Sequence, residues 1–136
     1  MDYSDHIDGF AEAPIAIDAA GIAEEGWADP EHGGVSWRSL IDARRTPSKG
    51  LTQGIMSLAP FTRLAPHRHT PAEIYFCLEG DGTLTIDGVD YALYPGVTVY
   101  VPSDAEHSTG AGADGVKVLY TFPTDSLANV DYRFSS

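Results

Sequence analysis

The chain has 136 residues, 43% of them hydrophobic, with 14 glycines and 9 prolines, which suits one globular domain rich in turns. Twenty acidic against eight basic residues give a formal charge of −12, so we expect neither nucleic acid nor a membrane surface as a partner. Cys77 is the only cysteine, and the start MDYSDHIDGF lacks the pattern of a signal peptide, so the sequence predicts a cytoplasmic protein.

Residues 1–34 differ in composition from the rest of the chain. They are acidic and rich in alanine and glycine, and they suggest one short helix from about Asp18 to Glu25, with Asp18 as its cap and Gly26 at its end. We therefore divide the chain into an N-terminal extension, residues 1–34, and a barrel domain, residues 35–136. The histidines of the extension, His6 and His32, are interpreted as surface residues.

From Val35 onward the sequence consists of short strand-like runs separated by turn residues. The candidate strands are residues 35–42, 51–59, 61–69, 72–79, 83–87, 89–94, 97–102 and 116–122. A strand about every ten residues, almost without helical periodicity, predicts an all-β sandwich or barrel. Asp87-Gly88 separates two alternating runs and predicts a hairpin with a type I′ turn.

A group of potential metal ligands begins at His67. Residues two apart on a strand share a face, so His67 and His69 lie side by side, and Glu73 returns to them after the break at Pro71. A lone pair of alternate histidines is usually just two half-exposed side chains, but here Glu73 and the more distant His107 accompany it. Two or three imidazoles with a carboxylate suit one divalent Fe, Mn, Ni, Co or Zn ion rather than Ca or Mg.

The same residues carry a resemblance to a known superfamily. His67, His69, Glu73 and Gly80 resemble the first signature of the cupins, and Gly96, Pro102 and His107 resemble the second, with 15 residues between Gly80 and Gly96. The resemblance implies a jelly-roll barrel whose three histidines and one glutamate bind a metal ion. Glycines of the family pattern are replaced by Phe61 and Asp104, and a late asparagine is replaced by Ala111, which places the turn geometry in question but none of the ligands.

A narrower resemblance suggests a reaction. The segments GVSWRSLIDA, HRHTPAEIY, VYVPSDAEH and FPTDSLANVDY are similar to the small cupin-type dimethylsulfoniopropionate lyases. In those enzymes the metal binds the substrate carboxylate, and a tyrosine two residues after the glutamate ligand removes the adjacent proton. The resemblance implies that Tyr75 is the base and that Tyr132 assists it, as catalytic residues of a lyase that releases dimethyl sulfide and acrylate. It also implies a homodimer.

The chemistry of the residues is compatible with these roles. On the run from Glu73, alternation places Tyr75 and Cys77 on the face of Glu73, with Ile74, Phe76 and Leu78 on the other. A free tyrosine has a pKa of about 10, and a nearby divalent cation lowers it by stabilising the anion. Aromatic rings can hold a sulfonium group by cation–π attraction. The candidate rings are Trp37, Tyr91, Tyr120 and Phe122.

Two other functions remain open from the sequence, because the cupin fold carries many activities. A non-haem iron dioxygenase would use the same four ligands and leave coordination positions for oxygen. A cupin that only binds a small ligand would contain the metal as a structural group and would tolerate a change of Tyr75.

Overall fold

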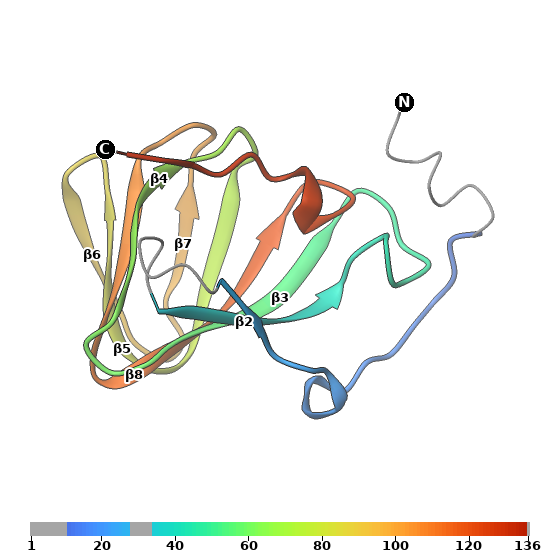
Figure 1. Ribbon diagram of the computed structural model, residues 1–136, viewed down its shortest axis with the longest axis horizontal. Helices are drawn as coiled ribbons and strands as arrows, with labels where there is room; N and C mark the ends of the chain where they lie inside the picture. The colour runs from blue at the N-terminus through green and yellow to red at the C-terminus, as the bar shows by residue number, and fades with distance from the viewer. Residues whose placement is uncertain (1–10, 28–33, 136) are drawn as a thin grey trace.

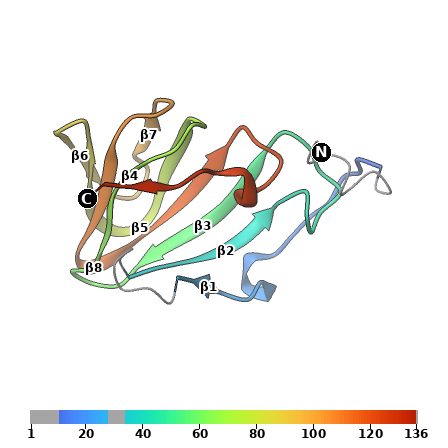
Figure 2. The same ribbon diagram turned by 45° about the horizontal axis from the view of Figure 1, so that its top comes forward.

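The computed structural model describes residues 11–27 and 34–135, which form one strongly curled antiparallel sheet (Figures 1 and 2). The strands are β1 (Glu25–Gly26), β2 (Val35–Ile41), β3 (Thr52–Leu58), β4 (Arg63–Arg68), β5 (Glu73–Ile86), β6 (Val89–Leu93), β7 (Thr98–Val101), β8 (His107–Phe122) and β9 (Arg133–Phe134). Two 3₁₀ turns, η2 (Ala19–Gly21) and η4 (Leu127–Asn129), are the helical elements of these residues. No helix in the described part of the chain has the length and apolar character needed to cross a membrane.

Two long strands, β5 and β8, hold the barrel together. The C-terminal half of β8 pairs with β3, from Thr52↔Phe122 to Leu58↔Val116. Its N-terminal half pairs with β4, where His67 lies opposite His107. β5 pairs with β8 along both halves and also carries β6 and β7. The all-β jelly-roll barrel that the sequence predicts is confirmed.

The extents of these two strands differ from the sequence prediction. The runs at residues 72–79 and 83–87 are parts of the single strand β5, and β8 begins nine residues before the run at residues 116–122. Residues 107–115 include three glycines and lack an alternating apolar pattern. Their strand conformation comes from pairing with β4 on one side and β5 on the other, which is a tertiary effect.

The predicted helix from Asp18 to Glu25 is wrong in its extent. The Asp18 side chain does cap a helical turn, accepting a hydrogen bond from the backbone N–H of Ala20, but the turn ends at Gly21. Glu25 and Gly26 form β1 and pair with β2 instead. The hydrogen bonds offered by an open sheet edge replace those of a short, weakly nucleated helix. His6 and His32 lie outside the described residues.

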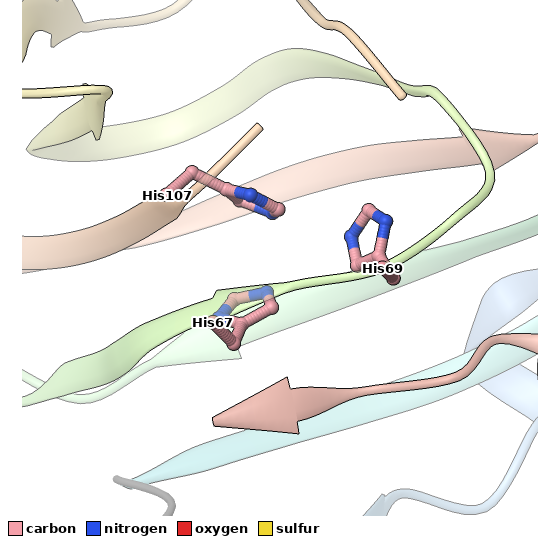
Figure 3. A group of neighbouring side chains, drawn as sticks. All are labelled: His67, His69 and His107. Carbon is pink, nitrogen blue, oxygen red and sulfur yellow. The ribbon is translucent and has the colours of Figure 1, made fainter. Parts of the chain in front are cut away.

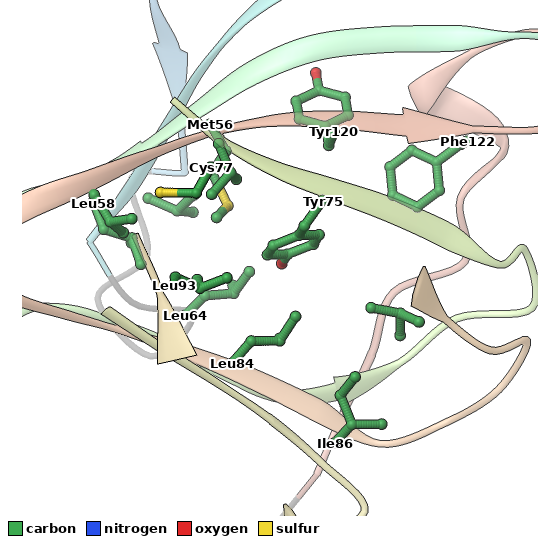
Figure 4. Packing of buried hydrophobic residues seen from close by; sticks show 14 of the residues in the cluster. Met56, Leu58, Leu64, Tyr75, Cys77, Leu84, Ile86, Leu93, Tyr120 and Phe122 are labelled. Carbon is green, nitrogen blue, oxygen red and sulfur yellow. The ribbon is translucent and has the colours of Figure 1, made fainter. Parts of the chain in front are cut away.

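The hairpin and the two faces of β5 are as predicted. Asp87 and Gly88 both have positive φ angles, 47° and 83°, and join the pair Ile86↔Val89, as a type I′ turn requires. Tyr75 and Cys77 point into the barrel, where they join the buried apolar side chains of β3, β4 and β8 (Figure 4). Ile74, Phe76 and Leu78 are exposed on the outer face.

The two residues that stand in place of glycines of the cupin pattern adopt a backbone conformation that favours glycine. Phe61 and Asp104 have φ angles of 60° and 63°, in the left-handed region that costs a residue with a Cβ about 1–2 kcal/mol. Asp104 is held there by its backbone N–H bond to the His69 carbonyl, and its carbonyl accepts from the Arg68 side chain. The turn beside the predicted ligands is therefore formed without glycine.

Candidate functional site

Three buried histidines meet at one end of the barrel interior (Figure 3). The available ligand atoms of His67, His69 and His107 all lie within 4.8 Å of one another, and each residue is 1% exposed. His67 and His107 are brought together because β4 and β8 pair at exactly these two residues. His69 follows two residues after His67, beyond the end of β4. These three side chains could hold a metal ion.

Each imidazole is oriented by a backbone carbonyl. Nδ1 of His67 is 2.7 Å from the Ala65 oxygen, Nδ1 of His69 is 2.8 Å from the Pro71 oxygen, and Nδ1 of His107 is 2.9 Å from the Ala105 oxygen. A carbonyl can only accept, so Nδ1 carries the proton in all three rings. Each Nε2 is then the nitrogen that faces the centre of the group, which is the usual arrangement around a bound metal.

Glu73, the first residue of β5, lies beside two of these histidines. Its Oε1 is 3.1 Å from Nε2 of His69 and 3.5 Å from Nε2 of His107. Burial by itself would raise the pKa of Glu73, but the proximity of His107 and His69 lowers it below its usual value. For His69, burial is outweighed by the Glu73 contact, so its pKa is raised. The carboxylate is therefore ionised and directed at the imidazole nitrogens.

The donor set fits a divalent transition ion. Nε2 of His107 is buried and has no hydrogen-bond partner among the described residues, so its lone pair is available to a metal ion. Burial, and then the charge of His107, lower the pKa of His67 to about 4, so this imidazole is neutral and can coordinate at neutral pH. Three imidazole nitrogens and one carboxylate oxygen are ligands that Fe, Mn, Ni, Co and Zn accept.

A cavity of about 510 Å³ opens beside this group, within the range of small-molecule sites. His67, Glu73, Tyr75 and Tyr132 all line it. Tyr75 is 1% exposed, and its hydroxyl is 3.1 Å from Oγ1 of Thr109. Burial and the charge of Glu73 raise the pKa of Tyr75, against the smaller opposite effect of the Thr109 contact. Thr109 is not among the site residues predicted from the sequence, although its spacing of two from His107 places both on one face of a strand.

Tyr132 reaches the cavity from the C-terminal segment, which crosses β4. Its ring centroid lies 5.4 Å from those of both His67 and His69. The next strand, β9, pairs with β4 at His67↔Phe134 and Arg68↔Arg133. Oδ1 and Oδ2 of Asp131 accept hydrogen bonds of 2.7 Å from the backbone N–H and hydroxyl of Thr70. Arg133 also pairs with Asp104, so the segment that carries Tyr132 is fixed on both sides of it.

The four candidate aromatic rings do not all reach the cavity. Trp37 and Tyr120 line it, Tyr91 is exposed on the outer surface, and Phe122 packs against His69 with a centroid distance of 5.2 Å. Trp27, a residue of the N-terminal extension, also lines the cavity. Its ring centroid lies 5.5 Å from that of Trp37 and 5.2 Å from that of Tyr132. A tryptophan in a segment without periodicity gives no local signal of such a position.

Two known proteins are similar to this chain in sequence. The chain is similar to the dimethylsulfoniopropionate lyase DddW of Ruegeria pomeroyi, with 43% identity over 123 residues that cover 90% of this chain and 81% of that protein. It is also similar to the uncharacterized protein MJ1618 of Methanocaldococcus jannaschii, with 34% identity over 59 residues, or 43% of this chain and 46% of that protein.

Solved structures share the fold at lower sequence identity. The polyketide cyclase RemF from Streptomyces resistomycificus matches with a TM-score of 0.77 and 18% identity, over 91% of this chain and 87% of that one. A chain from the crystal structures of the DMSP lyases RdDddP and RnDddQII matches with a TM-score of 0.72 and 20% identity, over 85% of this chain and 63% of that one. Residues 54–122 match the family described as Cupin domain, and this chain belongs to the cupin family.

Proposed function

We propose that the protein is a metal-dependent carbon–sulfur lyase that cleaves dimethylsulfoniopropionate, or a similar small carboxylate, into dimethyl sulfide and acrylate. The proposal is carried by the position of Tyr75, which lines the same cavity as His67 and Glu73, at the spacing from Glu73 that the lyases use for their base. The 43% identity to DddW over 90% of the chain supports the same activity.

His67, His69, Glu73 and His107 would hold the ion in this proposal. When bound, the ion supplies Lewis-acid chemistry, because a cation at the substrate carboxylate offsets the negative charge that develops when the neighbouring carbon loses its proton. The ions Fe, Mn, Ni, Co and Zn all accept imidazole and carboxylate ligands.

Tyr75 acts as the base. Its phenolate oxygen takes the proton from the carbon next to the carboxylate, and the C–H electron pair becomes the new C=C bond as the C–S bond breaks. The sulfur leaves with the electron pair of that bond as neutral dimethyl sulfide. Because burial and Glu73 raise the pKa of Tyr75, its ionisation depends on positive charge nearby, and the Thr109 hydroxyl can donate to the phenolate.

Tyr132 acts as an assisting group. Its ring packs on two of the proposed ligands and lines the cavity, so it can orient the substrate and keep water from it. The proton acceptor does not depend on Tyr132, so loss of its hydroxyl should lower the rate of elimination less than loss of the Tyr75 hydroxyl.

A headspace assay tests the proposed function directly. Purified protein, loaded in turn with each of the five divalent ions, is mixed with dimethylsulfoniopropionate, and dimethyl sulfide is measured in the gas phase. Release that requires both metal and protein supports a lyase. Substrate loss that consumes oxygen and occurs only with Fe(II) would instead indicate a dioxygenase, and binding without turnover would indicate a ligand-binding cupin.

Location and assembly belong to the same proposal. Cys77 is free and buried, in keeping with a reducing compartment such as the cytoplasm. We expect a homodimer, as in the similar lyases, and the exposed apolar side chains Ile74, Phe76 and Tyr100 on the outer face of the barrel support an association there. Light scattering on the purified protein measures the number of chains.

A further inference from the structure

The cavity also contains a buried charge that the proposed reaction does not use. Asp42, the residue after β2, is 7% exposed and lines the cavity. Its Oδ1 accepts from the backbone N–H of Arg44 at 3.0 Å, and its Oδ2 accepts from that of Leu127 at 3.1 Å. Within residues 11–27 and 34–135, no basic side chain lies within ion-pair distance of it. Amide donors solvate this carboxylate, but its formal negative charge is not neutralised.

A buried hydroxyl of the same cavity has no hydrogen-bond partner among the described residues. Tyr120 is 4% exposed and lines the cavity, and its hydroxyl makes no hydrogen bond within the described part of the chain. Its ring lies across Gly54, its neighbour on β3, where a Cβ would collide with the hydroxyl. In Figure 4 the hydroxyls of Tyr75 and Tyr120 point in opposite directions. A glycine inside a strand weakens it, so the space for this phenol comes at a cost in stability.

The charges around Tyr120 are mainly negative. Burial raises the pKa of Tyr120, and the charges of Glu73, Asp42 and Glu25 raise it further, while Arg45 opposes them. Arg45 is itself paired with Glu25 at 2.8 Å. Arg44 also lines the cavity, but it is exposed and its charge is screened by solvent. The carboxylates of Glu73 and Asp42 therefore both add negative charge to this part of the cavity.

We propose that Asp42 and Tyr120, with the face of Trp37, form a subsite for the cationic end of a zwitterionic substrate, in the cavity that opens beside the histidines. A sulfonium or quaternary ammonium group has no N–H to donate, so it is recognised by charge, by oxygen lone pairs and by aromatic faces. Asp42 supplies the charge, Tyr120 turns its oxygen toward the cation, and Trp37 supplies the ring. The carboxylate of the same ligand then lies at the histidines.

This inference rests on the proposed function for its substrate class, but its test does not need turnover. Two carboxylates of the same shape are compared on the metal-loaded protein by calorimetry. They are 3-(trimethylammonio)propanoate, which carries the cation, and 4,4-dimethylpentanoate, in which a neutral tert-butyl group replaces it. We expect the wild type to bind the cationic ligand about tenfold more tightly. The ratio of the two affinities isolates the effect of the charge.

Two variants assign this preference to the subsite. Asp42→Asn keeps one acceptor oxygen and removes the charge, so the cationic ligand should lose about tenfold in affinity while the neutral ligand changes little. Tyr120→Phe removes only a hydroxyl that has no partner, so the fold is retained, and the cationic ligand alone should bind about threefold more weakly. Asp90→Asn, an exposed carboxylate outside the cavity, is the matched control.

Equal binding of the two ligands by the wild type would overturn the inference. The same holds if Asp42→Asn weakens both ligands equally while remaining folded, because the effect is then structural. If Asp42→Asn does not fold, an unchanged affinity ratio in Tyr120→Phe overturns the subsite. Failure of the proposed lyase is a different result, since it appears as absent dimethyl sulfide while the charge preference is still measurable.

Discussion

Tyr75 and Tyr132 line one cavity but are supported in different ways. Tyr75 lies within the central strand β5, is almost fully buried, and has the Thr109 hydroxyl as its partner. Tyr132 lies on the C-terminal segment, is half-buried, and is held mainly through its ring contacts and through Asp131 next to it. Replacement of either hydroxyl by hydrogen keeps the ring packing, so the two residues can be compared without loss of the fold.

We expect Tyr75→Phe to lower the rate of elimination by a factor of about 10²–10⁴, because the proton acceptor is removed. Tyr132→Phe should cost less, since it leaves the base in place. The measurements are dimethyl sulfide release and metal content for both variants, and the metal content should equal that of the wild type. A Tyr75→Phe protein with a near wild-type rate would contradict the role of base, and equal severe losses would leave the base unassigned between the two.

At the scale of the element, local pattern predicts some strands and not others. The two faces of β5 from Glu73 to Leu78 follow from alternation, and the turn at Asp87-Gly88 follows from turn chemistry. The predicted ligands come together as expected because they lie on or beside strands that pair directly. The first half of β8 could not be found in this way, since its conformation depends on neighbours distant in sequence. The position of Asp42 in the cavity could not be predicted either, because in the sequence it looks like an ordinary turn residue.

The boundary at residue 34 separates the proposed metal ligands from the N-terminal extension, which contributes Trp27 to the cavity, and this separation can be tested. All four proposed ligands lie between residues 67 and 107, and among the described residues β1 pairs with β2 alone. A chain truncated to begin at Gly33 should therefore bind metal with the stoichiometry of the full chain. Its affinity for 3-(trimethylammonio)propanoate should fall, because Trp27 no longer packs against Trp37 and Tyr132.

Elemental analysis and calorimetry measure these two properties separately. Trp27→Ala in the full chain is the matched control, and it should reproduce the loss of affinity with β1 still present. Loss of metal from a truncated protein that remains folded would show that the boundary is misplaced.

At the scale of the whole molecule, the proposed metal site joins the two strands that close the barrel. Glu73 begins β5 and His107 begins β8, while His67 and His69 come from β4 and the turn after it. Since the unfolded chain cannot bring these four side chains together, binding of an ion there stabilises the folded state as a whole. Thermal unfolding is therefore a measure of site formation.

We expect about one divalent ion per chain, with a rise in melting temperature when the ion is in excess. At an ion concentration 100 times the dissociation constant, the gain in the free energy of unfolding is about 2.7 kcal/mol. His107→Ala removes one of the facing nitrogens and should lose both the bound ion and the rise, as measured by elemental analysis and calorimetric melting. His32→Ala is the control. Full occupancy in His107→Ala would contradict the site.

The carbonyls that orient the three imidazoles have a consequence for how this site changes in evolution. The acceptors belong to the main chain of Ala65, Pro71 and Ala105, not to side chains. Every amino acid supplies the same carbonyl, so substitutions at these three positions leave the acceptor in place as long as the backbone keeps its path. Selection on ring orientation therefore acts on the course of the backbone, and drift in side-chain identity at these three positions is tolerated.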